Sequence, residues 1–277
     1  DLVAYGGWPM DDHHPGGLKH KGDPTQFHFA PAPYGIPYRS LYSRGVDNLM
    51  CAGRNISVTH AALSSSRVMA TCSVIGQAVG TASAIAALNG MTPRQVGNER
   101  IRELQQRLLN DGCYLPWNPR DIPEITRHAK LSATNDNDVE SLRNGWGRPI
   151  GDELNGWRAS TGDRATYEWD TTQSINHLRI VFDSDLNRNC FGKGFSTNMP
   201  CRYTKDFVEQ HVPTTLVKAF RVEALSSDGQ WQTIWQEMSN HQRVLHREVD
   251  TEARAVRLVV EETWGDPEVT VFEWDAS

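Results

Sequence analysis

The residues best suited to proton transfer lie close together near the N-terminus. Asp11, Asp12, His13 and His14 follow one another in a segment rich in Gly and Pro, which is typical of a loop rather than a long helix. An imidazole titrates near neutral pH, so a histidine in such a loop can take the proton of a substrate hydroxyl. His60, at a predicted strand–helix turn, is a third candidate base.

Two other interpretations of this segment stay open. Asp11 and Asp12 can cap or turn the loop while one histidine has a structural role. A metal site from the same four residues is disfavoured, because neighbouring side chains usually point apart and no further ligand spacing supports one. We therefore predict no metal ligands.

A second acidic segment, Asp183-Ser-Asp-Leu-Asn-Arg-Asn189, begins like a calcium-binding loop. It lacks the Gly expected at the sixth position and the acidic residue expected at the twelfth, where Arg188 and Gly194 stand. An EF-hand is therefore excluded, and an ordinary loop is the prediction.

A long helix without charged residues is expected from Val68 to Leu88. Its content of Ala, Gly, Ser and Thr is too weakly apolar for a bilayer and suits a helix packed inside a protein. Gly76 and Gly80 share one helical face, where another backbone or a flat ligand can approach closely. Asn89-Gly90 is expected to end the helix, because glycine readily adopts the left-handed conformation of a C-terminal cap.

The elements on either side of this helix are also marked. A short apolar run over residues 48–52 predicts a buried strand that leads into a turn at Gly53. The run Thr92-Pro-Arg-Gln95 has the pattern of a capping box with proline at the first helical position, and it predicts a further helix that ends near Asp111. The apolar stripe of that helix is Val96, Ile101, Leu104 and Leu108.

From about residue 129 the sequence changes to short alternating segments separated by polar turns. This pattern predicts an antiparallel β-sandwich or jelly roll. The expected strands cover residues 165–169, 175–182, 216–224, 231–236, 255–260 and 269–274. A Pro-rich connector separates the two halves, so we predict a first domain over residues 1–115, a linker over 116–128 and a sandwich over 129–277.

Five motifs of the first domain form one pattern. They are Tyr5-Gly-Gly-Trp-Pro-Met-Asp-Asp-His-His14, Asn48-Leu-Met-Cys-Ala-Gly-Arg-Asn-Ile-Ser57, Thr59-His60, Ser66-Arg-Val-Met69 and Gly76-Gln-Ala-Val-Gly-Thr-Ala82. Together they resemble the C-terminal signature of bacterial FAD-dependent oxidoreductases of the glutathione-reductase-like superfamily. The resemblance implies an α+β fragment, the C-terminal part of an FAD/NAD(P)-binding Rossmann-type domain, in which the returning strand and helix close the FAD site.

The resemblance also implies roles for individual positions. The cofactor-binding residues that it carries over are Gly53, Arg54, Arg67, Met69, Thr71, Gly76 and Gly80. The first two would lie near the ribityl and pyrophosphate groups, and the next three near the isoalloxazine ring. The two helical glycines would serve close packing more than direct contact. Unpaired N–H groups at the helix N-terminus would hold negative charge that develops on a reduced flavin.

The chain departs from the family in one important respect. No Gly-x-Gly-x-x-Gly follows a strand anywhere in the 277 residues, so the half of the site that binds the ADP moiety is missing. We expect a separate N-terminal dinucleotide-binding segment or chain to be the partner, and we expect this chain alone to bind FAD poorly and to be inactive.

The second domain is similar to the galactose-binding-like sandwich of discoidin domains. The segments that carry this similarity are Asn155-Gly-Trp-Arg-Ala-Ser160, Tyr167-Glu-Trp-Asp170 and Leu178-Arg-Ile-Val-Phe-Asp183. Surface aromatic residues of such a domain can stack on sugar rings, but they more often belong to a core or an inter-domain contact.

Composition excludes some partners and leaves the compartment open. The net charge is −6 and no run of Lys and Arg occurs, which argues against nucleic acid and against an anionic membrane surface. The five cysteines are scattered, with a Cys190–Cys201 disulfide as one option and free thiols as the other.

Two functions are consistent with these observations. The first is part of a flavin-dependent oxidoreductase that transfers a hydride from a small hydroxylated substrate, a sugar or polyol, to FAD. The second is a non-catalytic module in which the sandwich binds carbohydrate and the flavin-like segment is vestigial. The sandwich is the sole support for a sugar substrate, and it is support by fold analogy alone.

Overall fold

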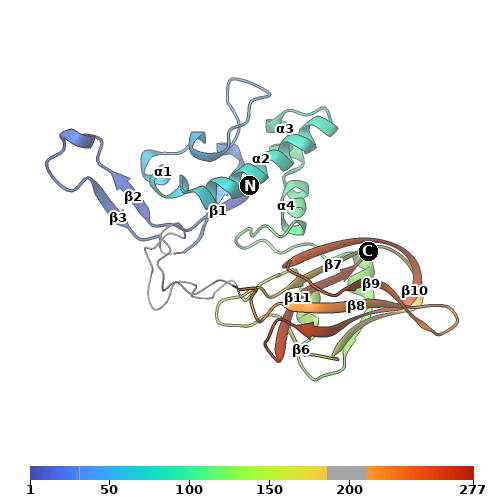
Figure 1. Ribbon diagram of the computed structural model, residues 1–277. Coiled ribbons are helices and arrows are strands. Elements are labelled where there is room, and N and C mark those ends of the chain that lie inside the picture. The colour runs from blue at the N-terminus through green and yellow to red at the C-terminus, as the bar shows by residue number, and fades with distance from the viewer. Residues whose placement is uncertain (31, 186–210) are drawn as a thin grey trace. The chain divides into compact units, whose positions relative to one another are not determined.

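The structure is a computed structural model that describes residues 1–30, 32–185 and 211–277. The chain divides into two compact units, Asp1–Arg120 and Asp121–Ser277 (Figure 1). Cys190 and Cys201, for which a disulfide was one option, and most of the calcium-like segment lie outside the described residues, whereas Cys51, Cys72 and Cys113 are free thiols.

The first unit contains two small antiparallel sheets. Strand β1 (Leu2–Gly6) pairs with β4 (Tyr34–Pro37), and β2 (Met10–His13) pairs with β3 (Thr25–His28). Three short 3₁₀ turns, η1 to η3, cover Gly17–Lys19, Tyr38–Ser40 and Gly53–Asn55. The Gly- and Pro-rich start of the chain therefore forms short strands and turns, as its composition predicts.

The helices of this unit are built around α2 (Met69–Leu88), which confirms the predicted long helix. Gly90 has a φ of 61° directly after it, so glycine is required at this left-handed position. One face of α2, with Ile75, Ala78 and Ala82, is buried in the core of the unit. By length and composition α2 is also a candidate membrane span, but core helices pass the same test.

Three further helices complete the unit, and the prediction of one continuous helix after Thr92 was wrong. Helix α1 spans His60–Ser66, and a break at Arg100 divides the single helix predicted after Thr92 into α3 (Pro93–Glu99) and α4 (Ile101–Asn110). A Cβ atom on Gly97 would lie 2.9 Å from the Tyr38 ring, so α3 is seated on that ring while α4 packs on α2.

The predicted buried strand over residues 48–52 does not form. Met50 makes one isolated bridge with Tyr42, and Leu49 is 47% exposed. No second strand pairs with this run among the described residues, and a strand without partners leaves its backbone groups to water.

The second unit is an antiparallel β-sandwich, as predicted. Two short helical segments, α5 (Glu124–His128) and η4 (Glu140–Arg143), accompany the strands. The strands are β5 (Lys130–Ala133), β6 (Trp157–Ser160), β7 (Arg164–Phe182), β8 (Val217–Leu225), β9 (Trp231–Glu237), β10 (Val244–Thr263) and β11 (Glu268–Ala276).

Strands β7 and β10 each belong to both layers of the sandwich. Their paired segments at residues 164–168 and 255–259 lie between β5 and β8, and β9 extends that layer. Their other halves pair with each other beside β11, which pairs with β6. Register shifts between Glu248 and Thr251 and between Ala253 and Ala255 mark where β10 passes from one layer to the other. Two strands predicted separately, at 165–169 and 175–182, are therefore one strand.

A single hydrophobic core lies between the layers. Trp157, Tyr167, Trp169 and Trp274 are all less than 9% exposed and belong to it. The Tyr167 hydroxyl donates to the main-chain oxygen of Trp274 at 2.8 Å. The aromatic residues singled out in the sequence are thus core residues.

Truncation of this core should destabilise the sandwich strongly. Ile180 on β7 is fully buried, so Ile180→Ala should lower the free energy of unfolding by about 2–5 kcal/mol. Thr172→Ala, on an exposed position of the same strand, is the matched control. Urea unfolding of both variants checks this, and equal stabilities would contradict the assigned core.

Asp163 fixes the turn between β6 and β7. Its carboxylate accepts hydrogen bonds from Thr134 Oγ1, Asn135 Nδ2 and Ser160 N at 2.8–2.9 Å. Burial alone would raise the pKa of Asp163, but these hydrogen bonds outweigh it and hold the pKa below its usual range.

This lowered pKa makes the stability of the unit depend on pH. A depressed carboxyl pKa stabilises the fold above the unfolded-state pKa of about 3.9, and the stabilisation is lost as the pH falls through the lower folded-state value. Asp163→Asn should therefore cost more stability at pH 7 than at pH 3. Denaturant unfolding at the two pH values measures the difference, and an equal cost at both would refute the assignment.

Candidate functional site

Strand β2 and helix α1 bring the predicted proton-transfer residues together. His13 Nε2 lies 3.2 Å from Asp11 Oδ2, and His60 Nε2 lies 2.9 Å from Asp12 Oδ1. Each carboxylate can hold one imidazole in a fixed orientation, which is the arrangement that general bases use. The structure therefore forms two Asp–His pairs.

Arg67, which directly follows α1, connects this helix to β2. Its Nη2 atom donates to the main-chain oxygen of Asp11 at 3.0 Å and lies 3.3 Å from Asp11 Oδ2. The backbone N–H of Arg67 donates to the Leu63 oxygen and closes α1, while Thr59 Oγ1 accepts from Ala62 N at its start. The helix is therefore capped at both ends, and its Arg67 side chain holds the strand.

Strand alternation separates the two pairs. Met10 and Asp12 point to one face of β2, and Asp11 and His13 to the other. Met10 and Ala62 help to line an apolar pocket of about 260 Å³, together with Phe29, Ala30, Tyr34 and Ser65. The Asp12–His60 pair is therefore the one placed beside this pocket.

Exposure leaves both pairs open to a substrate. The side chains of His13 and His60 are 56% and 62% exposed, whereas those of Asp11 and Asp12 are 29% and 37% exposed. The carboxylates are thus the supporting partners, and the imidazoles present their rings to solvent.

His14 is separated from these carboxylates. Its ring stacks on His20 with centroids 3.6 Å apart, and its Nδ1 atom accepts from Gly16 N at 3.0 Å. These contacts give His14 a place in the turn between β2 and β3. The catalytic role of His14 stays a prediction, and these contacts do not support it.

One supporting residue was not found in the sequence. The Tyr34 hydroxyl hydrogen-bonds to Ser65 on α1, and Ser65 Oγ donates to the Trp8 oxygen at 2.6 Å. A Cβ atom on Gly6 would lie 2.5 Å from the Tyr34 hydroxyl oxygen, so only glycine leaves room for this ring. The Gly6-Gly7 pair was a signal for such a close approach, but its partner is 28 positions away in the sequence.

The predicted cofactor residues surround the start of α2. Gly53 has a φ of 84° at the start of η3, and Arg54 beside it is exposed. Met69 is 80% exposed and Thr71 is 6% exposed. Val68 supplies no side-chain hydrogen bond at the N-terminus of α2, and Thr71 lines a small pocket of about 210 Å³ with residues of the Tyr5–Trp8 segment.

The face of α2 that carries Gly76 and Gly80 is open. A Cβ atom at either position would meet no atom of the described residues within 4 Å. The close packing predicted for these glycines therefore has no partner in the described part of the chain, and it stays a prediction.

The family comparison concerns the unit that contains this site. Residues 1–108 match the model of the FAD dependent oxidoreductase family. The match includes both Asp–His pairs, Arg67 and all of α2, and it confirms the resemblance seen in the sequence motifs. A search of curated proteins found no match.

Several solved structures similar to the chain are carbohydrate-binding modules. The family 32 module of Streptococcus pneumoniae EndoD is 13% identical, with 55% of this chain and 97% of that chain covered and a TM-score of 0.40. The galactose-bound family 32 module of C. perfringens NanJ is 8% identical, with 55% and 94% covered and a TM-score of 0.36. A chitotriose-bound module from Paenibacillus sp. IK-5 is 10% identical, with 55% and 98% covered and a TM-score of 0.38. At these TM-scores none of them assigns a ligand to this chain.

Loss of the Arg67 side chain should loosen β2. A two-stranded sheet is marginal by itself, so without Arg67 the β2–β3 hairpin should open more often. Arg67→Ala should make amide exchange in residues 10–13 and 25–28 about tenfold faster, because a hydrogen bond to a charged group contributes about 1.5–3 kcal/mol. Arg54→Ala is the control. Unchanged exchange in Arg67→Ala would contradict this role.

Proposed function

We propose that residues 1–108 form the closing part of an FAD-dependent oxidoreductase that oxidises a small hydroxylated substrate, a sugar or polyol. The observation that carries this proposal is the Asp12–His60 pair beside an apolar pocket, in a segment that matches the family. An imidazole held by a carboxylate suits the removal of a hydroxyl proton.

The proposed reaction needs one base and one hydride acceptor. The proton of the substrate hydroxyl passes to His60. The hydride leaves the carbon that bears this hydroxyl, and that carbon becomes a carbonyl carbon. FAD supplies the hydride acceptor in the complete protein. Asp12 orients the His60 ring and stabilises its protonated form, and the Asp11–His13 pair with Arg67 fixes the strand from which Asp12 projects.

The residues at the start of α2 fit a flavin in part. The first-turn N–H groups of this 20-residue helix receive no side-chain cap, so their positive end is available to an electron-rich ring edge. Arg54 is exposed beside Gly53 and is suited to a phosphate or ribityl oxygen.

A dinucleotide-binding segment beyond these 277 residues completes the proposed site. The chain contains no Gly-x-Gly-x-x-Gly fingerprint, and the open face of α2 with Gly76 and Gly80 offers a surface for close packing. We propose that this segment covers that face. The sandwich then adds a domain with a carbohydrate as its proposed ligand.

The test uses the full-length gene product with its bound flavin. His60→Gln should lower kcat by about 10²–10⁴-fold, while the visible flavin spectrum stays unchanged. His13→Gln should have a smaller effect, and His14→Gln, whose ring stacks on His20, should have the smallest. Turnover is followed by flavin reduction with a panel of sugars and polyols.

Two results would refute the proposal. One is a full-length product that stays colourless with added FAD. The other is full activity in His60→Gln with flavin still bound, which would remove this histidine from the reaction.

A further inference from the structure

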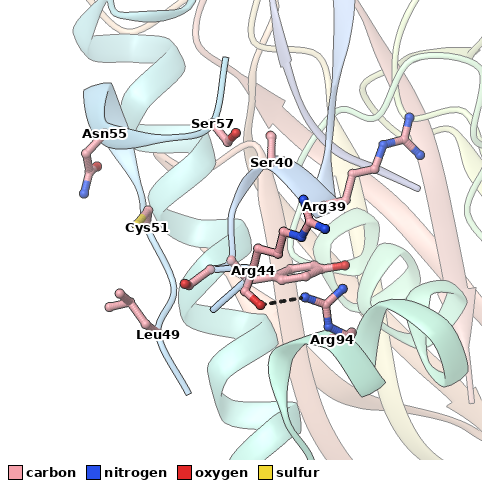
Figure 2. Close-up of a pocket in the computed structure, with 10 residues that line it drawn as sticks. Arg39, Ser40, Arg44, Leu49, Cys51, Asn55, Ser57 and Arg94 are labelled. Carbon is pink, nitrogen blue, oxygen red and sulfur yellow. Dashed lines mark hydrogen bonds between the residues drawn. The ribbon is translucent and has the colours of Figure 1, made fainter. Parts of the chain in front are cut away.

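A further, arginine-lined pocket of the first unit lies away from the Asp–His pairs. It has a volume of about 580 Å³ and is lined from η2, from the loop around Arg44 and from the start of α3 (Figure 2). Three of its lining residues are arginines, Arg39, Arg44 and Arg94, and none is acidic. This is a local excess of positive charge in a chain whose net charge is −6.

Two of the arginines have no carboxylate partner among the described residues. Arg94 Nη2 lies 3.5 Å from the main-chain oxygen of Arg44, and its guanidinium lies 5.2 Å from the centre of the Tyr42 ring (Figure 2). Arg44 makes no side-chain ion pair in the described part of the chain. Both guanidinium groups line the same pocket without a carboxylate beside them, so a bound anion would interact favourably with each.

Arg39 is partly neutralised and stands at the rim. Its Nη1 atom lies 3.3 Å from Asp1 Oδ1, and its side chain is 73% exposed. The pocket therefore depends mainly on Arg44 and Arg94, and Arg39 adds positive potential at the entrance.

The remaining lining residues supply neutral donors. Ser43 Oγ accepts from the backbone N–H groups of Gly45 and Val46, so its own proton is free to be donated. No residue in the described ranges hydrogen-bonds to the hydroxyl of Tyr42 or Ser57 or to the side-chain amide of Asn55. The pocket thus combines hydroxyl and amide donors with the guanidinium groups of Arg44 and Arg94. Such donors suit a ligand group that has many acceptor oxygens and more than one negative charge.

We propose that this pocket binds the phosphate groups of a small molecule through Arg44 and Arg94. Two kinds of ligand share this chemistry. One is the diphosphate of a dinucleotide such as the proposed flavin cofactor, and the other is a separate phosphorylated metabolite. With a separate metabolite as the ligand, the site goes beyond the proposed function, whereas with the flavin diphosphate it rests on that function. In both cases it is independent of proton transfer by the Asp–His pairs.

The experiment titrates the full chain with inorganic pyrophosphate by isothermal calorimetry. The unmodified chain should bind it, and Arg44→Ala and Arg94→Ala should each weaken binding at least tenfold. Arg94→Lys keeps the charge but loses the planar fork, so it should recover part of the affinity. Lys21→Ala removes the same charge from an exposed loop outside the pocket and should bind as the unmodified chain does.

Competition with FAD, carried out on the flavin-free full-length gene product because this chain alone is expected to bind FAD poorly, distinguishes the two kinds of ligand. Displacement of pyrophosphate by FAD, with weaker FAD binding in Arg44→Ala, identifies the dinucleotide diphosphate as the ligand. Pyrophosphate binding that FAD leaves unchanged identifies a separate phosphorylated molecule.

Two results overturn the site. One is the absence of pyrophosphate binding at millimolar concentration, and the other is equal binding by the unmodified chain and both alanine variants. A salt titration of the unmodified chain tests the proposal without substitutions, because binding to these guanidinium groups must weaken as ionic strength rises.

Discussion

The contact between Arg67 and Asp11 is the constraint on which the geometry of the proposed proton-transfer site depends. Strand β2 pairs only with β3 in the described part of the chain, and two-stranded sheets are marginal in water. Arg67 attaches β2 to the junction between α1 and α2, and α2 is itself fixed by its buried face. The position of Asp12 against His60 thus derives its stability from the helical core.

The sandwich has a different basis for its stability. Strands β7 and β10 bend at register shifts and contribute to both layers, so the layers share one core of aromatic and branched side chains. Trp157, Tyr167 and Trp274 pack there and are not offered to a ligand. Any carbohydrate bound by this unit must therefore be recognised by other residues.

Three features of the first unit have no partner group among the described residues. The start of α2 is uncapped, its Gly76–Gly80 face is open, and Arg44 and Arg94 face a pocket without a counter-charge. Each feature is unfavourable or unused in isolation and becomes favourable when an electron-rich ring, a close-packed backbone or a phosphate group is added. In the proposed flavin-binding domain, the cofactor and a further segment would supply the first two of these partners.

Local signals in the sequence determined much of this protein. Helix α2 with its Gly90 cap, the capping box at Thr92 and Gln95, and most sandwich strands follow from neighbouring residues, because caps and periodicity act over a few positions. The loop and turn motifs likewise marked His13, His14 and His60 as candidate bases.

Tertiary contacts decided the rest. Gly97 in α3 packs closely on the Tyr38 ring, His14 stacks on His20, and the run at 48–52 forms no strand because no second strand pairs with it among the described residues. Arg44 and Arg94 line one pocket although they are 50 positions apart in the sequence. No run of basic residues therefore indicated this pocket. Such features are set by which surfaces meet after folding, and composition and local spacing carry no information about that.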